Sequence, residues 1–142
     1  MEALKLHYDV DGEDFTTAGE ASSDVKRALR KMHFPQDVTR KVAICMYEGE
    51  INLVIHGGGG YIDVTVETDK VTMVLTDHGP GIPDVESAMR EGWSTASHDV
   101  REKGFGAGMG LPNMKRYSDS IQIDTELGVG TTVTMVVNVP QA

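Results

Sequence analysis

Three polar residues recur at intervals of four in the segment that follows Pro35. They are Glu48, Asn52 and His56, and on a helix this spacing stacks them along one face. Asparagine inside a helix carries a small local penalty, so its presence there needs a reason. A carboxylate and an amide oxygen one turn apart offer hard oxygen ligands to Mg²⁺ together with a nearby base. The pattern predicts a site for a magnesium-bound substrate, although such a polar file can also simply face water.

A second cluster is the loop at residues 77–84, with the sequence DHGPGIPD, which follows a segment with the pattern of a strand. A carboxylate at a strand end, Asp77, can accept a hydrogen bond from an exocyclic amine. Gly79 and Gly81 have no Cβ, so the backbone there can approach a flat ring closely. The cluster is suited to binding a planar base, but glycine and proline are also what an ordinary tight loop contains.

A third cluster, residues 104–111 with the sequence GFGAGMGL, precedes a helical segment. Alternating glycines before a helix expose backbone N–H groups at the positive end of the helix dipole, an arrangement that favours phosphate. The chain contains no G-x-x-x-x-G-K-[ST] motif, and residues 104–111 lack the G-x-G-x-x-G spacing. The sequence therefore argues against the P-loop and Rossmann types of phosphate site.

The elements that must position these clusters follow from hydrophobic periodicity. The expected strands are residues 4–10, 61–68, 71–76, 120–125 and 131–139. The expected helices run from an N-cap at Ser22 or Ser23 to before Pro35, from Pro35 to about residue 55, and over residues 111–117, with a short helix at 85–90. Gly49 costs about 1 kcal/mol relative to alanine, which predicts a locally loose helix. This order predicts an α+β fold, with helices on one face of a mixed, mostly antiparallel sheet.

Size and charge limit the classes of function. The chain has 142 residues, one cysteine (Cys45) and a net charge of −9, which predicts a single domain over residues 1–142 in a reducing cytoplasm and argues against nucleic-acid binding. No apolar run is long enough to span a membrane, and the N-terminus lacks a signal-peptide pattern. One cysteine and scattered histidines do not form a zinc motif. Six bases fall within residues 21–41, as either a solvated face or a docking surface.

The order of the motifs carries more information than any one of them. E-x-x-x-N-x-x-x-H, then D-x-G-x-G-I, then G-x-G-x-G-L, then GVGTT at residues 128–132 resembles the GHKL ATPase superfamily over roughly residues 20–140. Within it, GMGLPNMKR at residues 108–116 is similar to the small anti-sigma-factor serine/threonine kinases. The resemblance implies the Bergerat ATP-binding fold, a two-layer α/β sandwich with about three helices on one face.

The resemblance also implies roles for individual residues. Glu48 would be the base and Asn52 the Mg²⁺ ligand, while Asp77 would hold the adenine amino group. Gly79, Gly81 and Ile82 would line the adenine pocket, with Thr131 or Thr132 behind the base. The residues implied on the phosphate side are His56, Lys103, Gly104, Gly106, Gly108, Met109, Gly110 and Leu111. His56 could instead cap its helix. The mobile lid would span about residues 92–105, where either Arg101 or Lys103 would reach the γ-phosphate or belong to a solvated hinge.

The function that this resemblance implies is an ATP-dependent serine/threonine protein kinase with ATP and Mg²⁺ as cofactors. Its partner would be a small antagonist-type protein or a sigma factor, and a homodimer is possible through the N-terminal strand. Two alternatives stay open. One is a stand-alone catalytic domain of the histidine-kinase type, and the other is a non-catalytic binder whose shape the nucleotide controls. The presence of Glu48 beside Asn52 favours catalysis, since a pure binder does not need the base.

Overall fold

The computed structural model describes residues 3–12, 18–55, 58–82, 85, 89 and 110–141. In this part of the chain the strands are β1 (Leu4–Asp11), β2 (Gly59–Val66), β3 (Lys70–Asp77), β4 (Ser120–Glu126) and β5 (Gly130–Asn138), and the helices are α1 (Glu20–Lys31), α2 (Gln36–Ile55) and α5 (Gly110–Tyr117). Apart from the start of α1, these bounds lie within about two residues of those expected from the sequence. The short helix expected at 85–90 falls mostly outside the described residues, although the Met89 N–H donates to the Val85 carbonyl at 3.0 Å.

The five strands form one sheet in the order β1-β2-β3-β5-β4. Each neighbouring pair is antiparallel, so the described sheet is antiparallel throughout where a mixed one was expected. The last strand, β5, lies between β3 and β4, and its register sets Asp77 opposite Thr131. The topology therefore brings Asp77, the first residue of the second cluster, next to the GVGTT motif at residues 128–132.

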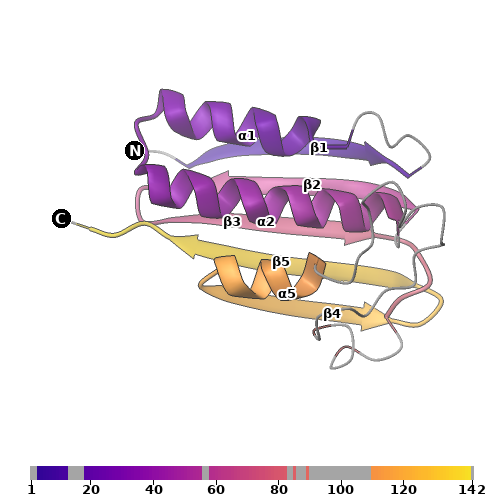
Figure 1. Ribbon diagram of the computed structural model, residues 1–142. Coiled ribbons are helices and arrows are strands. Elements are labelled where there is room, and N and C mark those ends of the chain that lie inside the picture. The colour runs from indigo at the N-terminus through magenta and orange to yellow at the C-terminus, as the bar shows by residue number, and fades with distance from the viewer. Residues whose placement is uncertain are drawn as a thin grey trace.

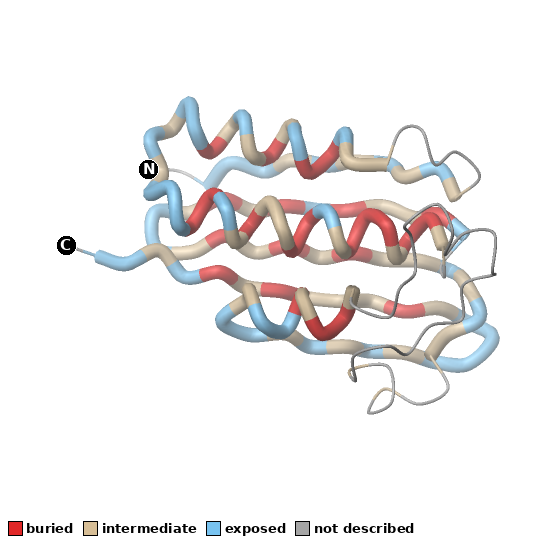
Figure 2. The backbone as a smooth tube through the Cα atoms, viewed as in Figure 1, coloured by how far each residue is buried: buried red, intermediate tan, exposed pale blue. Residues whose placement is uncertain are grey.

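The three helices pack on one face of this sheet, with α2 between α1 and α5 (Figure 1). Strand residues alternate between the faces, so that Ile62 and Val64 are buried beneath the helices while Asp63 is exposed on the other side. The buried residues concentrate on the inner side of α2 and on the central strands (Figure 2). The fold is the two-layer α+β sandwich expected from the sequence.

The start of α1 differs from the prediction. The helix begins at Glu20, and its N-cap is Gly19 with φ +102°, not Ser22 or Ser23. Ser22 is buried inside the first turn, where its hydroxyl donates to the Gly19 carbonyl at 3.0 Å. A serine in the first turn has the same composition signal as a cap, so the local sequence misplaces this boundary.

Since Gly19 has no side chain, the side chain that caps the first N–H groups of α1 comes from another helix. The carboxylate of Glu50 on α2 accepts hydrogen bonds from the backbone N–H groups of Ala21 and Ser22, at 3.2 and 3.1 Å. Glu50 is only 3% exposed, and its charge lies at the positive end of the α1 dipole. This contact satisfies two backbone donors that would otherwise be unpaired and fastens α1 to α2.

Gly49 does not loosen α2, contrary to the expectation from its helix propensity. The helix is continuous through this position, and Gly49 is buried. A Cβ built on Gly49 would lie 2.2 Å from Cδ2 of Leu75. The glycine therefore allows α2 to lie close against β3, which outweighs its local cost.

Candidate functional site

The predicted site residues that the structure describes gather at one edge of the sandwich. At this edge β3 ends and β5 begins, and α2 ends close to the start of α5 (Figure 1). Asn52 lies in the last turn of α2, and a Cβ built on Gly110 would come within 2.8 Å of its Oδ1 atom. The start of α5, directly after the glycine-rich segment, is thus in contact with the predicted magnesium ligand.

Asp77 is fixed by the backbone at the end of β3. Its Oδ1 atom accepts hydrogen bonds from the N–H groups of Gly79 and Thr131, at 2.9 and 3.2 Å. None of the described residues donates to Oδ2 of this carboxylate. One oxygen therefore holds the loop and the neighbouring strand, while the other keeps its capacity to accept a hydrogen bond from a ligand amine.

The loop after Asp77 is tied to the β4–β5 hairpin by Thr125, a residue that sequence reasoning missed. Its hydroxyl accepts from the Ile82 N–H at 2.8 Å and lies 2.8 Å from the hydroxyl of Thr131. Gly81 has φ +82°, and a Cβ there would lie 2.7 Å from the Glu126 carbonyl oxygen. The glycine thus serves the close approach of loop and hairpin. A signal was present in the alternating pattern of β4, which sets Thr125 opposite Thr131.

The two candidate threonines have different positions. Thr131 is buried and pairs with Asp77 across the β3–β5 ladder. Thr132 pairs with Thr76, so its side chain points to the opposite face of the sheet. The structure brings Thr131 to the Asp77 carboxylate and does not bring Thr132 there.

Glu48 lies one turn before Asn52 on α2 and is half-buried. Burial raises the pKa of its carboxyl, and a hydrogen bond from the side chain of Asn113 on α5 lowers that pKa in part. A carboxyl with a raised pKa is a better proton acceptor once it is ionised. The sequence pattern did not single out Asn113, although it is an asparagine inside a helix, the same signal that marked Asn52.

The remaining predicted residues divide into two groups. Leu111 is 6% exposed and belongs to the hydrophobic core, so its side chain packs beneath the start of α5. The following residues lie outside the described part of the chain: His56, Lys103, Gly104, Gly106, Gly108 and Met109. The predicted lid at 92–105, with Arg101, also lies outside it.

The protein oxygen available at this edge, on the Asn52 side chain, suits a magnesium ion that is bound mainly by nucleotide phosphates and water. Within the described ranges no three histidine, cysteine, aspartate or glutamate side chains gather to hold a metal. The side-chain amide of Asn52 accepts no hydrogen bond and donates none among the described residues, and Gly110 has no Cβ to obstruct it. Mg²⁺ keeps several waters and binds through one or two protein oxygens plus phosphates, so one amide oxygen at this edge fits the ion.

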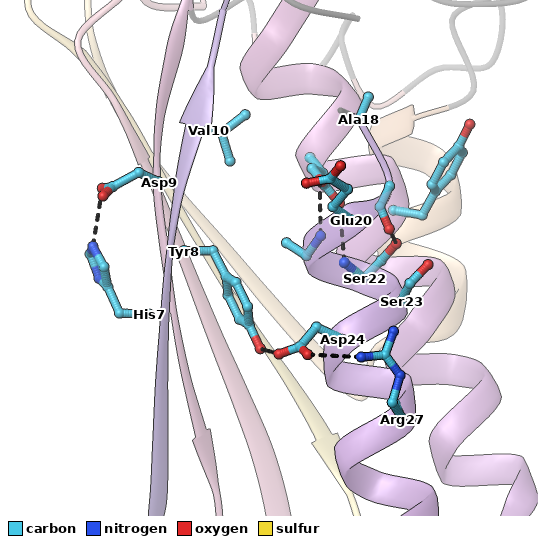
Figure 3. A pocket seen from close by; sticks show the side chains of 14 residues that line it. His7, Tyr8, Asp9, Val10, Ala18, Glu20, Ser22, Ser23, Asp24 and Arg27 are labelled. Carbon is cyan, nitrogen blue, oxygen red and sulfur yellow. Dashed lines mark hydrogen bonds and ion pairs between the residues drawn. The ribbon is translucent and has the colours of Figure 1, made fainter. Parts of the chain in front are cut away.

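A separate cavity of about 920 Å³ lies between β1 and the start of α1 (Figure 3). Here the Tyr8 hydroxyl donates to Asp24 at 2.5 Å, and Asp24 pairs with Arg27 at 3.4 Å. Burial, followed by the bond to Asp24, raises the pKa of Tyr8. The lining also includes Glu50 but none of the predicted nucleotide-binding residues. Its carboxylates do not suit a phosphate ligand.

The matching family model covers most of the chain. The model of the histidine kinase-like ATPase domain matches residues 13–137. This chain belongs to the histidine kinase-like ATPase family. In the described part of the chain, no helix has both the length and the apolar character needed to cross a membrane.

Relatives of this chain include two proteins from Bacillus. An anti-sigma F factor of Bacillus licheniformis is 33% identical over 103 residues, which is 68% of this chain and 67% of the relative. The serine/threonine-protein kinase RsbT of Bacillus subtilis (strain 168) is 31% identical over 86 residues, which is 58% of this chain and 59% of that kinase.

Two solved structures share the fold at lower identity. The RsbU and RsbW domains of Rv1364c from Mycobacterium tuberculosis give a TM-score of 0.64 at 16% identity, over 98% of this chain and 33% of that one. The mycobacterial sensor histidine kinase MprB gives a TM-score of 0.55 at 17% identity, over 98% of this chain and 100% of that one.

Proposed function

We propose that this chain is an ATP-dependent serine/threonine protein kinase of the anti-sigma type, which phosphorylates a small regulatory partner. The observation that carries the proposal is the meeting of Asn52, Asp77 and Gly110 at one edge of the sandwich, with Glu48 one turn from Asn52. The names of two relatives, an anti-sigma F factor and a serine/threonine-protein kinase, support the choice of substrate class.

In this proposal Asp77 and Asn52 bind the nucleotide at its two ends. The free oxygen of Asp77 accepts the hydrogen bond of the adenine amino group, since its other oxygen is held by two backbone N–H groups. Asn52 supplies an amide oxygen to the magnesium ion. The backbone N–H groups at the start of α5 lie beside Asn52 and stabilise the phosphates. Bound Mg-ATP supplies the phosphoryl group that is transferred.

Glu48 acts as the base. Its carboxylate takes the proton of the acceptor hydroxyl while the hydroxyl oxygen forms its bond to the γ-phosphorus. The bond from that phosphorus to the bridging oxygen breaks, and ADP leaves with the electron pair. Asn113 positions the Glu48 carboxylate through its hydrogen bond and favours its ionised form, because that bond lowers the pKa that burial raises. Most of the rate in such transfers comes from positioning and electrostatic stabilisation.

The test compares wild type with Glu48→Gln. Each protein is incubated with γ-labelled ATP and a soluble extract of its source cells, and labelled sites are mapped by mass spectrometry. We expect wild type to label a serine or threonine of a small protein. We expect the variant to bind ATP normally by calorimetry and to lose labelling by roughly 10²- to 10⁴-fold. Glu67→Gln, at the β2–β3 turn, is the matched control.

Two outcomes contradict the proposal in different ways. Equal labelling by wild type and Glu48→Gln removes Glu48 from the reaction. Normal ATP binding by wild type with no labelled protein favours a binder whose shape the nucleotide controls.

A further inference from the structure

A shallow groove of about 280 Å³ runs over the outer surface of the helical layer, between α1 and α2. Its lining includes Ser23 and Lys26 of α1 and Ala43, Ile44, Tyr47 and Glu48 of α2. The groove is distinct from the adenine edge, because neither Asp77 nor Gly110 lines it. It is a second route to Glu48, from the side of the helices.

Glu48 is the residue that joins this groove to the nucleotide site. It lines the groove, it is hydrogen-bonded to Asn113 on α5, and it precedes Asn52 by one helical turn. A chain lying in the groove would place a side-chain hydroxyl next to the Glu48 carboxylate. The nucleotide would reach the same region from the edge where Asn52 contacts Gly110. Acceptor and donor thus approach from different sides, as in-line transfer requires.

The segment that forms α1 and the start of α2 has a net charge opposite in sign to that of the chain as a whole. The net charge is −9, yet residues 21–41 contain six bases and two acids. Arg27 pairs with Asp24 and Lys41 with Asp37. Among the described residues, Lys26 has no ion-pair partner, and neither does Arg30.

The unpaired bases lie beside one another. Lys26 lines the groove, and Arg30 follows it by one turn on the same face of α1. Arg40 on α2 is not part of this pair, because its guanidinium lies over the ring of Tyr117 on α5, 5.6 Å from the centroid, and it does not line the groove. The positive charge next to the groove therefore comes from Lys26 and Arg30 on α1.

The groove also offers apolar contact area. Tyr47 is 42% exposed, and Ile44 is partly exposed beside it. Exposed tyrosine with a polar rim is typical of surfaces that bind protein segments. Contact area and positive charge together suit a peptide that carries negative charge.

We propose that this groove binds the acceptor segment of the protein substrate, and that acidic residues flank the serine or threonine in that segment. The inference rests on the proposed function, because it takes Glu48 as the base. Lys26 and Arg30 pair with the flanking carboxylates, Tyr47 and Ile44 contact the segment, and Glu48 receives the acceptor hydroxyl. The basic helix surface is therefore a docking surface, and not simply a solvated face.

The test uses two pools of fluorescent peptides with a central serine, flanked either by aspartate and glutamate or by lysine and arginine. Binding to the full chain is measured by anisotropy in the presence of a non-hydrolysable ATP analogue. We expect the acidic pool to bind at least tenfold more tightly than the basic pool. Lys26→Glu should remove this preference, and Tyr47→Ala should weaken the binding of the acidic pool at least fivefold. Lys5→Glu makes the same change of charge on exposed β1, outside the groove, and should leave the preference intact.

The outcomes separate this inference from the proposed function. Equal binding of the two pools, no binding of either, or an equal effect of Lys26→Glu and Lys5→Glu overturns the docking inference. Calorimetry with ATP on the same proteins tests the nucleotide site independently. If ATP binds and Glu48-dependent labelling occurs while the two pools bind equally well, the proposed kinase function is supported and the docking inference is wrong.

Discussion

The side chain of Asn113 on α5 hydrogen-bonds the carboxylate of Glu48 on α2. The two residues belong to helices that meet where Gly110 contacts Asn52. Because Asn113 lies on α5, the position of α5 and the ionisation of Glu48 are linked through one contact. This link makes the first prediction one about pH.

Asn113→Ala should move the acid limb of the pH–rate profile to higher pH. Glu48, the proposed base, can accept a proton only when it is ionised, so activity should fall as the pH drops through its pKa. Burial already raises that pKa, and Asn113 opposes the rise. Without Asn113 the pKa rises further, while the rate at high pH is largely kept. The measurement is phosphotransfer rate against pH. Lys115→Ala, exposed on the same helix, is the control, and coincident acid limbs for all three proteins would contradict the role of Asn113.

Asp77→Asn should weaken ATP binding by roughly ten- to hundredfold, because a buried donor left facing the adenine amino group costs about 1–3 kcal/mol. The asparagine oxygen can still accept from Gly79 and Thr131, so the free energy of unfolding should change little. Calorimetry measures the affinity and urea denaturation the stability. Asp124→Asn, exposed on β4, is the matched control. Unchanged ATP affinity would remove Asp77 from the site.

Gly49→Ala should destabilise the fold by about 1–3 kcal/mol, through overpacking against Leu75. Helix propensity alone predicts the opposite sign, a gain of about 1 kcal/mol. Urea denaturation decides between them. Leu75→Val removes the Cδ2 atom that the new Cβ would meet, so the double variant should show a favourable coupling relative to the two single changes. A more stable Gly49→Ala protein would show that α2 does not need this close approach.

Glu50→Ala should lower the free energy of unfolding by about 1–3 kcal/mol, because it leaves the N–H groups of Ala21 and Ser22 without their acceptor. Glu50→Gln keeps the shape and one acceptor oxygen, so its loss should be smaller. The order wild type, glutamine, alanine is checked by denaturation. Hydrogen exchange at the two amides gives a local readout, and unchanged protection of both in the alanine variant would show that Glu50 is not the cap.

The sequence predicted elements whose signal is local. Alternation gave β1 and the β2–β3 hairpin, and helical spacing gave α2, all close to their observed bounds. The polar spacing on α2 and the glycines after Asp77 indicated which residues to examine, and the structure brings Asp77, Asn52 and Gly110 to one edge.

The features that sequence reasoning missed all depend on contacts between distant segments. The cap of α1 comes from Glu50, which lies 28 or more residues away from the amides it accepts from. Thr125 acts through Ile82, at a separation of 43 residues. Gly49 is explained by Leu75. No periodicity or propensity of a single segment contains this information, because each contact is set by how the layers pack.

The placement of the last strand between two earlier ones has a consequence for synthesis. Asp77 leaves the ribosome 54 residues before Thr131, the partner that fixes its carboxylate, and β4 can reach its place only when β5 has entered between it and β3. In a nascent chain that ends before β5, the Asp77 carboxylate, the proposed adenine acceptor, has only the Gly79 N–H of its two backbone donors. If ATP binds at the proposed site, it would stabilise the complete chain more than one that ends before β5, so a cell rich in ATP would favour complete chains.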